Sequence, residues 1–418
     1  MDRFSKYCKI ISGYAFKAKD LMEESDIPVI KIGNISNGGN VNFSSNTQYV
    51  DKSFLSLDEK YHIKNRDILI SLTGSHMNQP NSMVGRSCRS YDNDIYLLNQ
   101  RAGKVIPFDN ANKDYLYYLL SSEEMKYSIV IRAYGAANQV NISPSDIEGI
   151  KWDFPEYDVQ CKIGKILATY DDLIEKNNRK IQILQDMAEE LYKEWFVRFR
   201  FPGHETAKFT DGIPDGWEYK PFSEVVTYER GVSYSSDEID CEDGINLINL
   251  KNINSYGGFR LDGTKKYNGK YRNGQIVECG DLVMGVTDMT QDRRTVGAVA
   301  LVPHFDNTCV ISADLVKLNS DIDNLFIYSL CRYGYYSKFF SQFANGSNVL
   351  HLKPSSLRNQ KVLIPREDLI DSYVKVVKPI NNIVNNLNRE NDNLKQQRNL
   401  LLPRLMSGKL EVKVKQEV

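Results

Sequence analysis

The side chains that most often carry catalysis are scattered along this chain. Its five histidines stand alone at positions 62, 76, 204, 304 and 351, without the HExxH or HxH spacing that holds a catalytic zinc ion. Its seven cysteines form no CxxC pair, which argues against structural zinc or a disulfide framework and favours a reducing, cytoplasmic setting. A GxxxxGK[ST] phosphate loop is also absent. The sequence therefore predicts no metal site, no bound cofactor and no catalytic centre.

One short segment superficially resembles catalytic machinery. PDGWEYK, at 214–220, contains the acidic and lysine residues of a metal-dependent nuclease. In such a nuclease these residues lie on separate strands of a hairpin, and the acids here are too close in sequence to do so. We interpret the segment as a linker at the start of a new domain, and the chain as a binding protein rather than an enzyme.

Loops rich in basic and amide side chains suggest DNA as the ligand. On a duplex, Lys and Arg neutralise phosphates, whereas Arg, Lys, Asn, Gln, Ser and Thr read base edges. RLDGTKKYNGKYR, at 260–272, has five basic residues against one acidic residue. An ordinary solvated hairpin would show the same composition, so both interpretations stay open. The net charge of −1 weakens a DNA interpretation without excluding it, because a groove can be basic on a neutral chain.

Two further pairs of loops carry candidate base-reading side chains. TGSHMNQPNS (73–82) and TDMTQDRRT (287–295) follow similar strands but differ in sequence, as loops reading two different half-sites would. Any unselected surface loop would diverge as well. GAANQVN (135–141) and ANGSNVLH (344–351) keep Gly and Asn at matching places, which turns alone could require. The candidate DNA-binding residues are Lys31, Asn34, Thr73, Ser75, His76, Arg86, Asn138, Gln139, Lys251, Asn252, Lys265, Lys266, Lys270, Arg272, Thr287, Arg293, Arg294, Asn348 and His351.

The elements that must position these loops occur twice along the chain. Matching strand segments are IPVIKIGNI (27–35) with INLINLKNI (245–253), and RDILISLTG (66–74) with GDLVMGVTD (280–288). Further along, an offset of 210 residues holds without a gap, so that Pro155 matches Pro365 and Leu184 matches Leu394. Short strands mixed with a helical segment in each copy predict an α+β unit. A duplication this long indicates the order globular domain, helix, globular domain, helix.

A long helix is expected at 163–195, between the two globular domains. Its apolar side chains recur at two heptad positions, the pattern of a coiled-coil seam. The seam residues are Ile163, Tyr170, Asn177, Leu184 and Leu191 at one position and Leu167, Ile174, Ile181, Ala188 and Trp195 at the other. At ~1.5 Å per residue the seam is roughly 50 Å long. Alone, its apolar stripe would face water, so the helix needs a partner.

The repeat supplies that partner, a second helix at about 370–402. In an antiparallel pair, Asn177 can share a layer with Asn391. This register disfavours slippage, because a slipped amide would face leucine unpaired. Other facing pairs are then Trp195 with Tyr373 and Tyr170 with Arg398. The alternative is that each helix pairs with a separate subunit.

The predicted fold class is α+β, with two similar globular domains joined by two long helices that form an antiparallel coiled coil with pseudo-two-fold symmetry. The assigned regions are a first globular domain at 1–152, a first helical region at 153–205, a second globular domain at 206–362 and a second helical region at 363–418. Pro379 is expected to kink the second helix, and Pro403 to end it before Leu405. No apolar run approaches the ~20 residues that span a membrane.

The repeated pattern resembles the specificity subunit of type I restriction–modification enzymes. The resemblance covers essentially the whole chain and is carried by IPVIKIGNISNGG, GDLVMGVTD, FPEYDVQCKIGKILATYDDLI, LYKEWFVRFRFPG, DGIPDGWE and LLPRLMSGKLEV. Two features depart from the family: the chain starts almost directly at the first domain, without a counterpart of IPDGWE, and Pro379 lies inside the second helix.

This resemblance implies a non-catalytic subunit with two target-recognition domains. Each domain would read one half of an asymmetric bipartite sequence in double-stranded DNA, and the coiled coil would set the spacer. The helices would dock two methyltransferase subunits, with two restriction subunits as possible further partners. S-adenosylmethionine and ATP would bind those partners rather than this chain. The candidate docking face, for which a solvated surface is the alternative, comprises Asp171, Asp172, Asn178, Lys193 and Glu194.

The alternative from another class is a scaffold whose two lobes bind proteins. Steep loss of binding with rising salt would distinguish DNA recognition from that role, because neutralised phosphates release counterions.

Overall fold

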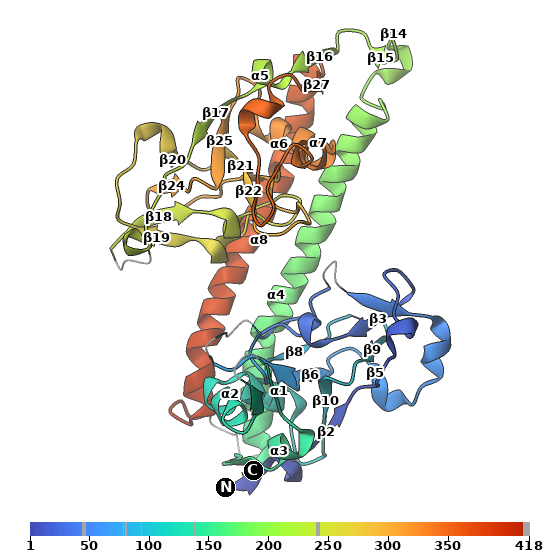
Figure 1. The fold of residues 1–418 in the computed structure, drawn as a ribbon, viewed down its shortest axis with the longest axis vertical. Helices are drawn as coiled ribbons and strands as arrows, with labels where there is room; N and C mark the ends of the chain where they lie inside the picture. The colour runs from blue at the N-terminus through green and yellow to red at the C-terminus, as the bar shows by residue number, and fades with distance from the viewer. Residues whose placement is uncertain are drawn as a thin grey trace, which may run out of the picture. The chain divides into compact units, whose positions relative to one another are not determined.

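Two compact units make up the chain. The computed structural model describes residues 1–43, 47–77, 79, 82–92, 94–136 (backbone only at 136), 139–239 and 243–412. The first unit comprises Met1–Asn177 with Asn391–Val418, and the second comprises Asn178–Glu390 (Figure 1). Each unit therefore contains one globular domain and one end of each long helix, a division that cuts both helices.

The first unit is built on two four-stranded sheets, ordered β2-β10-β6-β8 and β4-β3-β9-β5, with a smaller sheet β11-β12-β7 and the pair β1-β13. Its strands are β1 (Asp2–Arg3), β2 (Cys8–Ser12), β3 (Ile27–Ile30), β4 (Gln48–Val50), β5 (His62–Ile63), β6 (Ile68–Ser71), β7 (Thr73–Gly74), β8 (Ser87–Arg89), β9 (Tyr96–Leu98), β10 (Ala102–Pro107), β11 (Tyr134–Ala136), β12 (Gln139–Asn141) and β13 (Lys151–Trp152). Its short helices are α1 (Lys113–Ser121), α2 (Glu123–Val130) and α3 (Pro144–Glu148).

The second unit repeats this topology. Its four-stranded sheets are ordered β17-β25-β21-β23 and β19-β18-β24-β20, and its two-stranded pairs are β22-β26, β16-β27 and β14-β15. The strands are β14 (Phe209–Thr210), β15 (Ile213–Pro214), β16 (Glu218–Pro221), β17 (Thr227–Arg230), β18 (Ile245–Ile248), β19 (Lys265–Tyr267), β20 (Ile276–Val277), β21 (Leu282–Gly285), β22 (Thr287–Asp288), β23 (Val299–Leu301), β24 (Cys309–Ile311), β25 (Leu315–Asn319), β26 (Leu350–His351) and β27 (Lys361–Ile364). The short helices are α5 (Phe222–Val225), α6 (Asn324–Tyr333) and α7 (Tyr336–Ser341). The predicted repeat and α+β class are confirmed.

Matching elements form for matching reasons in the two units. All four residues of β6 and of β21 are buried, which explains their unbroken apolar runs. The next α-helices, α1 and α6, are capped by the preceding residues Asn112 and Asp323, whose side chains accept hydrogen bonds from backbone N–H groups of the first turn.

The segment interpreted as a linker is part of the second unit. Trp217 is buried in its core, and β16 pairs with β27 through Glu218 opposite Ile364. The linker interpretation of 214–220 was therefore wrong, because the tryptophan needs a buried site and its neighbours complete a sheet.

The long helices are α4 (Tyr157–Tyr192), which ends in a π-helical turn at Lys193–Val197, and α8 (Glu367–Met406). Within the second unit, the rings of Trp195 and Tyr373 are 6.0 Å apart between centroids. This confirms the predicted antiparallel pairing at that end. Within the first unit, Arg398 forms an ion pair with Asp171, one residue beyond its predicted neighbour Tyr170.

Asn177 and Asn391 are both buried in the first unit. Their burial agrees with seam positions, and their direct side-chain pairing stays a prediction.

The expected effect of Pro403 on the second helix was wrong. α8 continues through Pro403 to Met406, and Ser407 N–H donates to the carbonyl of Pro403 at 3.1 Å. Leu405, which was expected outside the helix, is 3 % exposed and packs in the core of the first unit. Burial of this side chain favours continuing the helix despite the backbone hydrogen bond that proline cannot make.

Candidate nucleic-acid interface

The two loops that were singled out separately in each copy lie side by side in one small sheet. In the first unit, β7 pairs with β12, and Thr73 Oγ1 donates to Asn141 Oδ1 at 2.7 Å. In the second unit, β22 pairs with β26, with Thr287 opposite His351. We call 73–82 with 134–141 the first loop pair, and 287–295 with 344–351 the second loop pair.

Each loop pair presents polar side chains to solvent. His76 and Gln139 are exposed in the first, and Asn348 and His351 in the second. Arg294 is partly exposed beside them and forms a 2.7 Å ion pair with Asp292. The predicted contact Asn138 lies outside the described residues.

Several predicted contacts support the loops from inside instead. Thr287 is buried and its hydroxyl donates to Asp314 at 2.8 Å, and the buried Ser75 hydroxyl donates to the Gln79 carbonyl at 2.8 Å. Arg86 is 9 % exposed, and its guanidinium donates to the carbonyls of Met83 and Ile32. The residues corrected from DNA contacts to internal supports are Thr73, Ser75, Arg86 and Thr287, because burial keeps their polar atoms from a ligand.

Asn34 and Asn252 are also corrections, and they form the same turn twice. Asn34 Oδ1 accepts from Lys31 N–H at 2.9 Å, while its Nδ2 donates to the Asn42 carbonyl and the Thr47 hydroxyl, both at 3.0 Å. Asn252 makes the equivalent three bonds, with Asn249 N–H at 2.9 Å and with Arg260 and Thr264 at 2.8 Å. Both side chains are buried, so their amides hold the chain after β3 and β18.

The basic segment 260–272 belongs to a different sheet from the second loop pair. Lys265 and Lys266 lie on the edge strand β19, where Lys266 Nζ donates to Asn246 Oδ1 at 3.2 Å. The candidate cations exposed in this region are Lys251, Lys270 and Arg272, while the exposed Arg260 pairs with Asp262 at 2.9 Å. The structure therefore separates phosphate-type candidates from base-type candidates within the second unit.

Two remaining candidate cations are partly buried and bonded to the protein. Lys31 Nζ bonds to Gln48 Oε1, and burial lowers the pKa of this lysine. Arg293 donates from its guanidinium to the Ser341 carbonyl at 3.0 Å. Both side chains are therefore better placed to hold their loops in shape than to offer a positive charge to DNA.

A cluster of charges inside the first unit was missed by the sequence analysis. Arg89 is fully buried, 2.9 Å from Asp114 Oδ1 and 4.0 Å above the ring of Tyr117. Arg66 bonds to Asp114 at 3.0 Å and to Asp172 at 2.7 Å. The available signals in the sequence were an arginine within the segment SCRS and two aspartates directly after Tyr170 of the predicted seam.

The same cluster ties both long helices to the globular domain of the first unit. Tyr118 donates its hydroxyl to Asp171 Oδ2 at 2.6 Å, and Arg398 binds the other oxygen of that carboxylate. Burial and the Asp171 carboxylate raise the pKa of the Tyr118 phenol, so the tyrosine remains the proton donor. We call Arg66, Arg89, Asp114, Tyr118, Asp171, Asp172 and Arg398 the ionic cluster.

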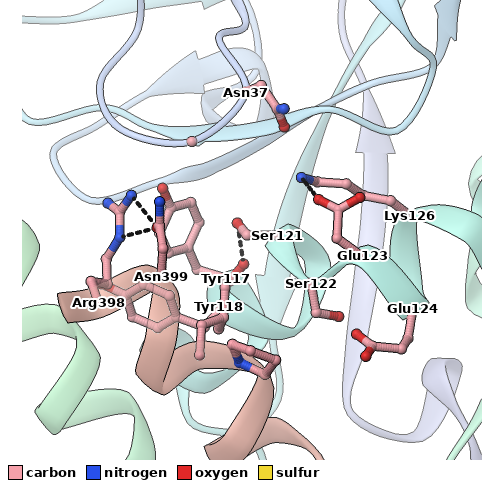
Figure 2. A pocket seen from close by; sticks show the side chains of 13 residues that line it. Asn37, Tyr117, Tyr118, Ser121, Ser122, Glu123, Glu124, Lys126, Arg398 and Asn399 are labelled. Atoms are coloured by element: carbon pink, nitrogen blue, oxygen red, sulfur yellow. Dashed lines mark hydrogen bonds and ion pairs between the residues drawn. The ribbon is translucent and has the colours of Figure 1, made fainter. Parts of the chain in front are cut away.

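A cavity of about 440 Å³ opens beside this cluster (Figure 2). Tyr117 and Ser121 of α1 line it, together with Asn399 of α8, Asn37 and the start of α2. Both cations along its wall are engaged by carboxylates, Lys126 by Glu123 at 3.0 Å and Arg398 by Asp171. Two glutamates at its rim repel phosphate, so this cavity is a poor DNA site.

The described residues include no group of three or more His, Cys, Asp or Glu side chains placed to bind a metal ion. Nor does any described helix combine the length and apolar character required to cross a lipid bilayer.

This fold and its loop pairs define a protein with two like recognition units. Residues 6–185 match the family described as "Type I restriction modification DNA specificity domain". The chain is 27% identical over 328 residues to the MjaIX specificity subunit of a type I restriction enzyme from Methanocaldococcus jannaschii, covering 75% of this chain and 73% of that protein. It is 22% identical over 351 residues to the MjaVIII specificity subunit of the same organism, covering 77% and 80%.

A solved S subunit of a type I restriction–modification system from M. genitalium has the same fold, with a TM-score of 0.57 at 14% identity over 97% of this chain and 95% of that one. Residues 6–185 thus match the specificity domain of type I restriction–modification systems, and most of the chain is similar to specificity subunits of these systems.

Proposed function

We propose that this chain recognises DNA sequence for a type I restriction–modification complex, each unit reading one half of a bipartite asymmetric site. The observation that carries the proposal is the repeated placement of the loop pairs. The same topology holds a short strand pair in both units, whereas its exposed side chains differ between His76 with Gln139 and Asn348 with His351. Equal scaffolds with unequal side chains suit two unequal half-sites.

The exposed side chains have the chemistry that such reading requires. Asn and Gln can pair with adenine, and His and Arg can donate to acceptors on guanine. In the second unit, Lys251, Lys270 and Arg272 are exposed cations that could neutralise phosphates and set orientation without reading sequence.

We further propose that the long helices set the spacer and dock two methyltransferase subunits. Docking is supported by a matched pair of exposed apolar residues on each helix, Ile166 with Leu173 and, 210 residues later, Val376 with Ile383. An apolar surface repeated in this way suits two copies of one partner. On this proposal, S-adenosylmethionine and ATP bind to partner subunits, methyl transfer takes place there, and two restriction subunits could join.

The charged docking face suggested by the sequence fits less well. Asp171 and Asp172 lie in the ionic cluster, Lys193 pairs with Glu189 at 2.7 Å, and Glu194 pairs with Arg198. Because these charges are already paired within the chain, the apolar pairs are the stronger candidates.

Methylome sequencing of cells expressing the whole complex tests half-site reading. Wild-type cells should show one bipartite methylated motif. The double variant His76→Ala/Gln139→Ala should relax or abolish the first half-site, and Asn348→Ala/His351→Ala only the second. Replacing residues 211–360 with those of a relative should likewise change one half. A change in both halves from either exchange would contradict modular reading.

Salt dependence separates this function from a protein-binding scaffold. The complex with methyltransferase subunits should retain its duplex at low salt and lose affinity steeply as salt rises. Failure to retain the duplex at low salt would favour the scaffold. Inserting residues into α4 should change the spacer while leaving both half-sites intact.

A further inference from the structure

The loop after β22 holds a methionine out in solvent. Met289 is 70% exposed, while its chain neighbour Asp288 is 3% exposed. The following residues Gln291 and Asp292 are polar and exposed. A large apolar side chain in this position gains nothing from the fold of the unit.

The backbone around Met289 is held by one buried carboxylate. Asp288 accepts hydrogen bonds from the N–H and hydroxyl of Thr290, both at 2.9 Å, and from the N–H of Thr295 at 2.7 Å. Burial acts to raise the pKa of Asp288, but these hydrogen bonds outweigh it and the pKa is lowered, which keeps the carboxylate charged. Met289 is therefore presented by an ordered turn rather than by a loose loop.

The far side of the turn is tied to the other segment of the second loop pair. Gln291 Nε2 donates to the Ser347 carbonyl at 2.9 Å, next to the exposed Asn348. Thr287, two residues before Met289, pairs with the exposed His351. Met289 thus lies in the same loop pair as the exposed candidate base-reading side chains.

We propose that Met289 recognises the 5-methyl group of a thymine in the half-site read by the second unit, an inference that rests on the proposed function. On the major-groove edges of the four bases, the thymine methyl is the apolar group, and every other feature is a donor or an acceptor. An exposed thioether side chain can bury that methyl but cannot satisfy a donor or acceptor. Its unbranched chain also adapts to the shape of the contact.

The first loop pair carries a counterpart. Met77 follows the exposed His76 and is 38% exposed. By the same argument it is placed to contact a thymine methyl in the other half-site, which provides an internal comparison.

Deoxyuridine substitution tests the inference in the complete complex with methyltransferase subunits. Each thymine of the second half-site, on either strand, is replaced in turn by deoxyuridine, which removes only the methyl group. One replacement should weaken wild-type binding about fourfold, the factor for losing one buried methyl contact. The Met289→Ala complex should bind the two duplexes equally.

Two matched variants serve as controls. Met187→Ala removes a methionine that is 55% exposed on α4 and should keep full sensitivity to deoxyuridine. Met77→Ala should keep that sensitivity in the second half-site and lose it only in the first.

Three results would overturn the inference while leaving half-site reading intact. They are a second half-site of G·C pairs alone, no deoxyuridine effect at any thymine in the wild-type complex, and equal weakening of both duplexes by Met289→Ala. The last result would indicate a wedge or packing role. Failure of the wild-type complex to bind its methylated motif at low salt would instead reject the proposed function, and this inference with it.

Discussion

The two units differ in how their globular domains attach to the long helices. The first combines the ionic cluster with an apolar contact that includes Leu167 and Leu405, whereas the second relies on packed aromatic rings. Phe326 of α6 lies 5.3 Å from Phe196 and 6.3 Å from Tyr373, and Tyr192 packs against all three rings.

One pair of equivalent positions shows a charged residue in the first unit replaced by an apolar residue in the second. Arg89, opposite Ile68 in the sheet, corresponds to Leu301, opposite Leu282. The fold therefore depends on strand register and helix packing, and the junction can be ionic or apolar. This difference predicts that the two units fail for different reasons.

Buried cysteines allow each unit to be followed separately. Cys88 is buried in the first unit and Cys331 in the second, and burial raises the pKa of each thiol to about 12. Pulsed thiol labelling with mass spectrometry therefore reports opening of each unit, while the exposed Cys279 gives the reference rate.

The largest effect is expected from Asp171→Ala. It leaves the partly buried Arg398, whose side chain is 19% exposed, without its carboxylate and removes the acceptor of the Tyr118 hydroxyl, so the first unit should lose about 3 kcal/mol or more of unfolding free energy. Labelling of Cys88 should accelerate while that of Cys331 stays unchanged. The double variant Asp171→Leu/Arg398→Met should recover much of the loss, because no charge is left unpaired. Equal acceleration at both cysteines would contradict separate junctions.

A somewhat smaller effect is expected from Phe326→Ala in the second unit. Removing this fully buried ring should cost about 3 kcal/mol, the lower part of the usual range, because neighbouring rings can move into the space. Cys331 should label faster and Cys88 should not. Phe326→Leu is the matched control, with a cost below about 1.5 kcal/mol. If the alanine variant were no less stable than the leucine variant, the aromatic junction would not matter.

Asn34→Ala and Asn252→Ala should cost about 1–2 kcal/mol each, because each removes a buried amide that bonds one backbone N–H and one backbone carbonyl of its turn. Here the two units should respond alike, unlike in the first two tests. The methylated motif should stay unchanged in both variants. A relaxed half-site would restore these residues to the DNA-contacting set.

The smallest effect near neutral pH concerns the buried tyrosines. Burial and the nearby Asp171 carboxylate raise the pKa of Tyr91 to about 12, and burial raises that of Tyr192 in the second unit. A phenol with a raised folded-state pKa contributes fully below about pH 10, its unfolded value, and that contribution is lost as pH rises through the folded value. Urea unfolding at pH 7, 9 and 11 should show the loss from the tyrosines only at the last. A smaller loss should already begin near pH 9 in both units, because the buried thiols of Cys88 and Cys331 ionise more readily in the unfolded chain. A loss at pH 9 that persisted in Cys88→Ala/Cys331→Ala would argue that another group titrates there.

The heptad and repeat patterns predicted much of the architecture. They located both helices and the Trp195–Tyr373 contact, because seam burial depends on periodicity along one helix face. The rule that proline ends a helix failed at Pro403, because the burial of Leu405 outweighs one missing hydrogen bond.

The site residues were harder to predict because composition does not show which way a side chain faces. A residue type shared by the two copies would have indicated a structural role better than polarity indicated a DNA contact. Asn34 and Asn252 are the same residue type in both copies because they close the same turn. The side chains of His76 and Met289 close no such turn, so the residue types at their loop positions can differ between the two copies. The buried Arg89 could not be predicted, since a charged residue in a short strand normally indicates an exposed face.

The division of the chain also has a consequence for how it is made on the ribosome. The second unit is one continuous stretch, Asn178–Glu390, whereas the first needs residues from 391 onward. Arg398 and Leu405, which complete the ionic cluster and the core of the first unit, are therefore synthesised after the whole second unit. Of the two domains, the one that is translated first must wait, with part of its apolar surface uncovered, until the residues from 391 onward have been made. A stop codon shortly after residue 390 would leave a finished second unit beside an incomplete first unit, a product that proteases should remove.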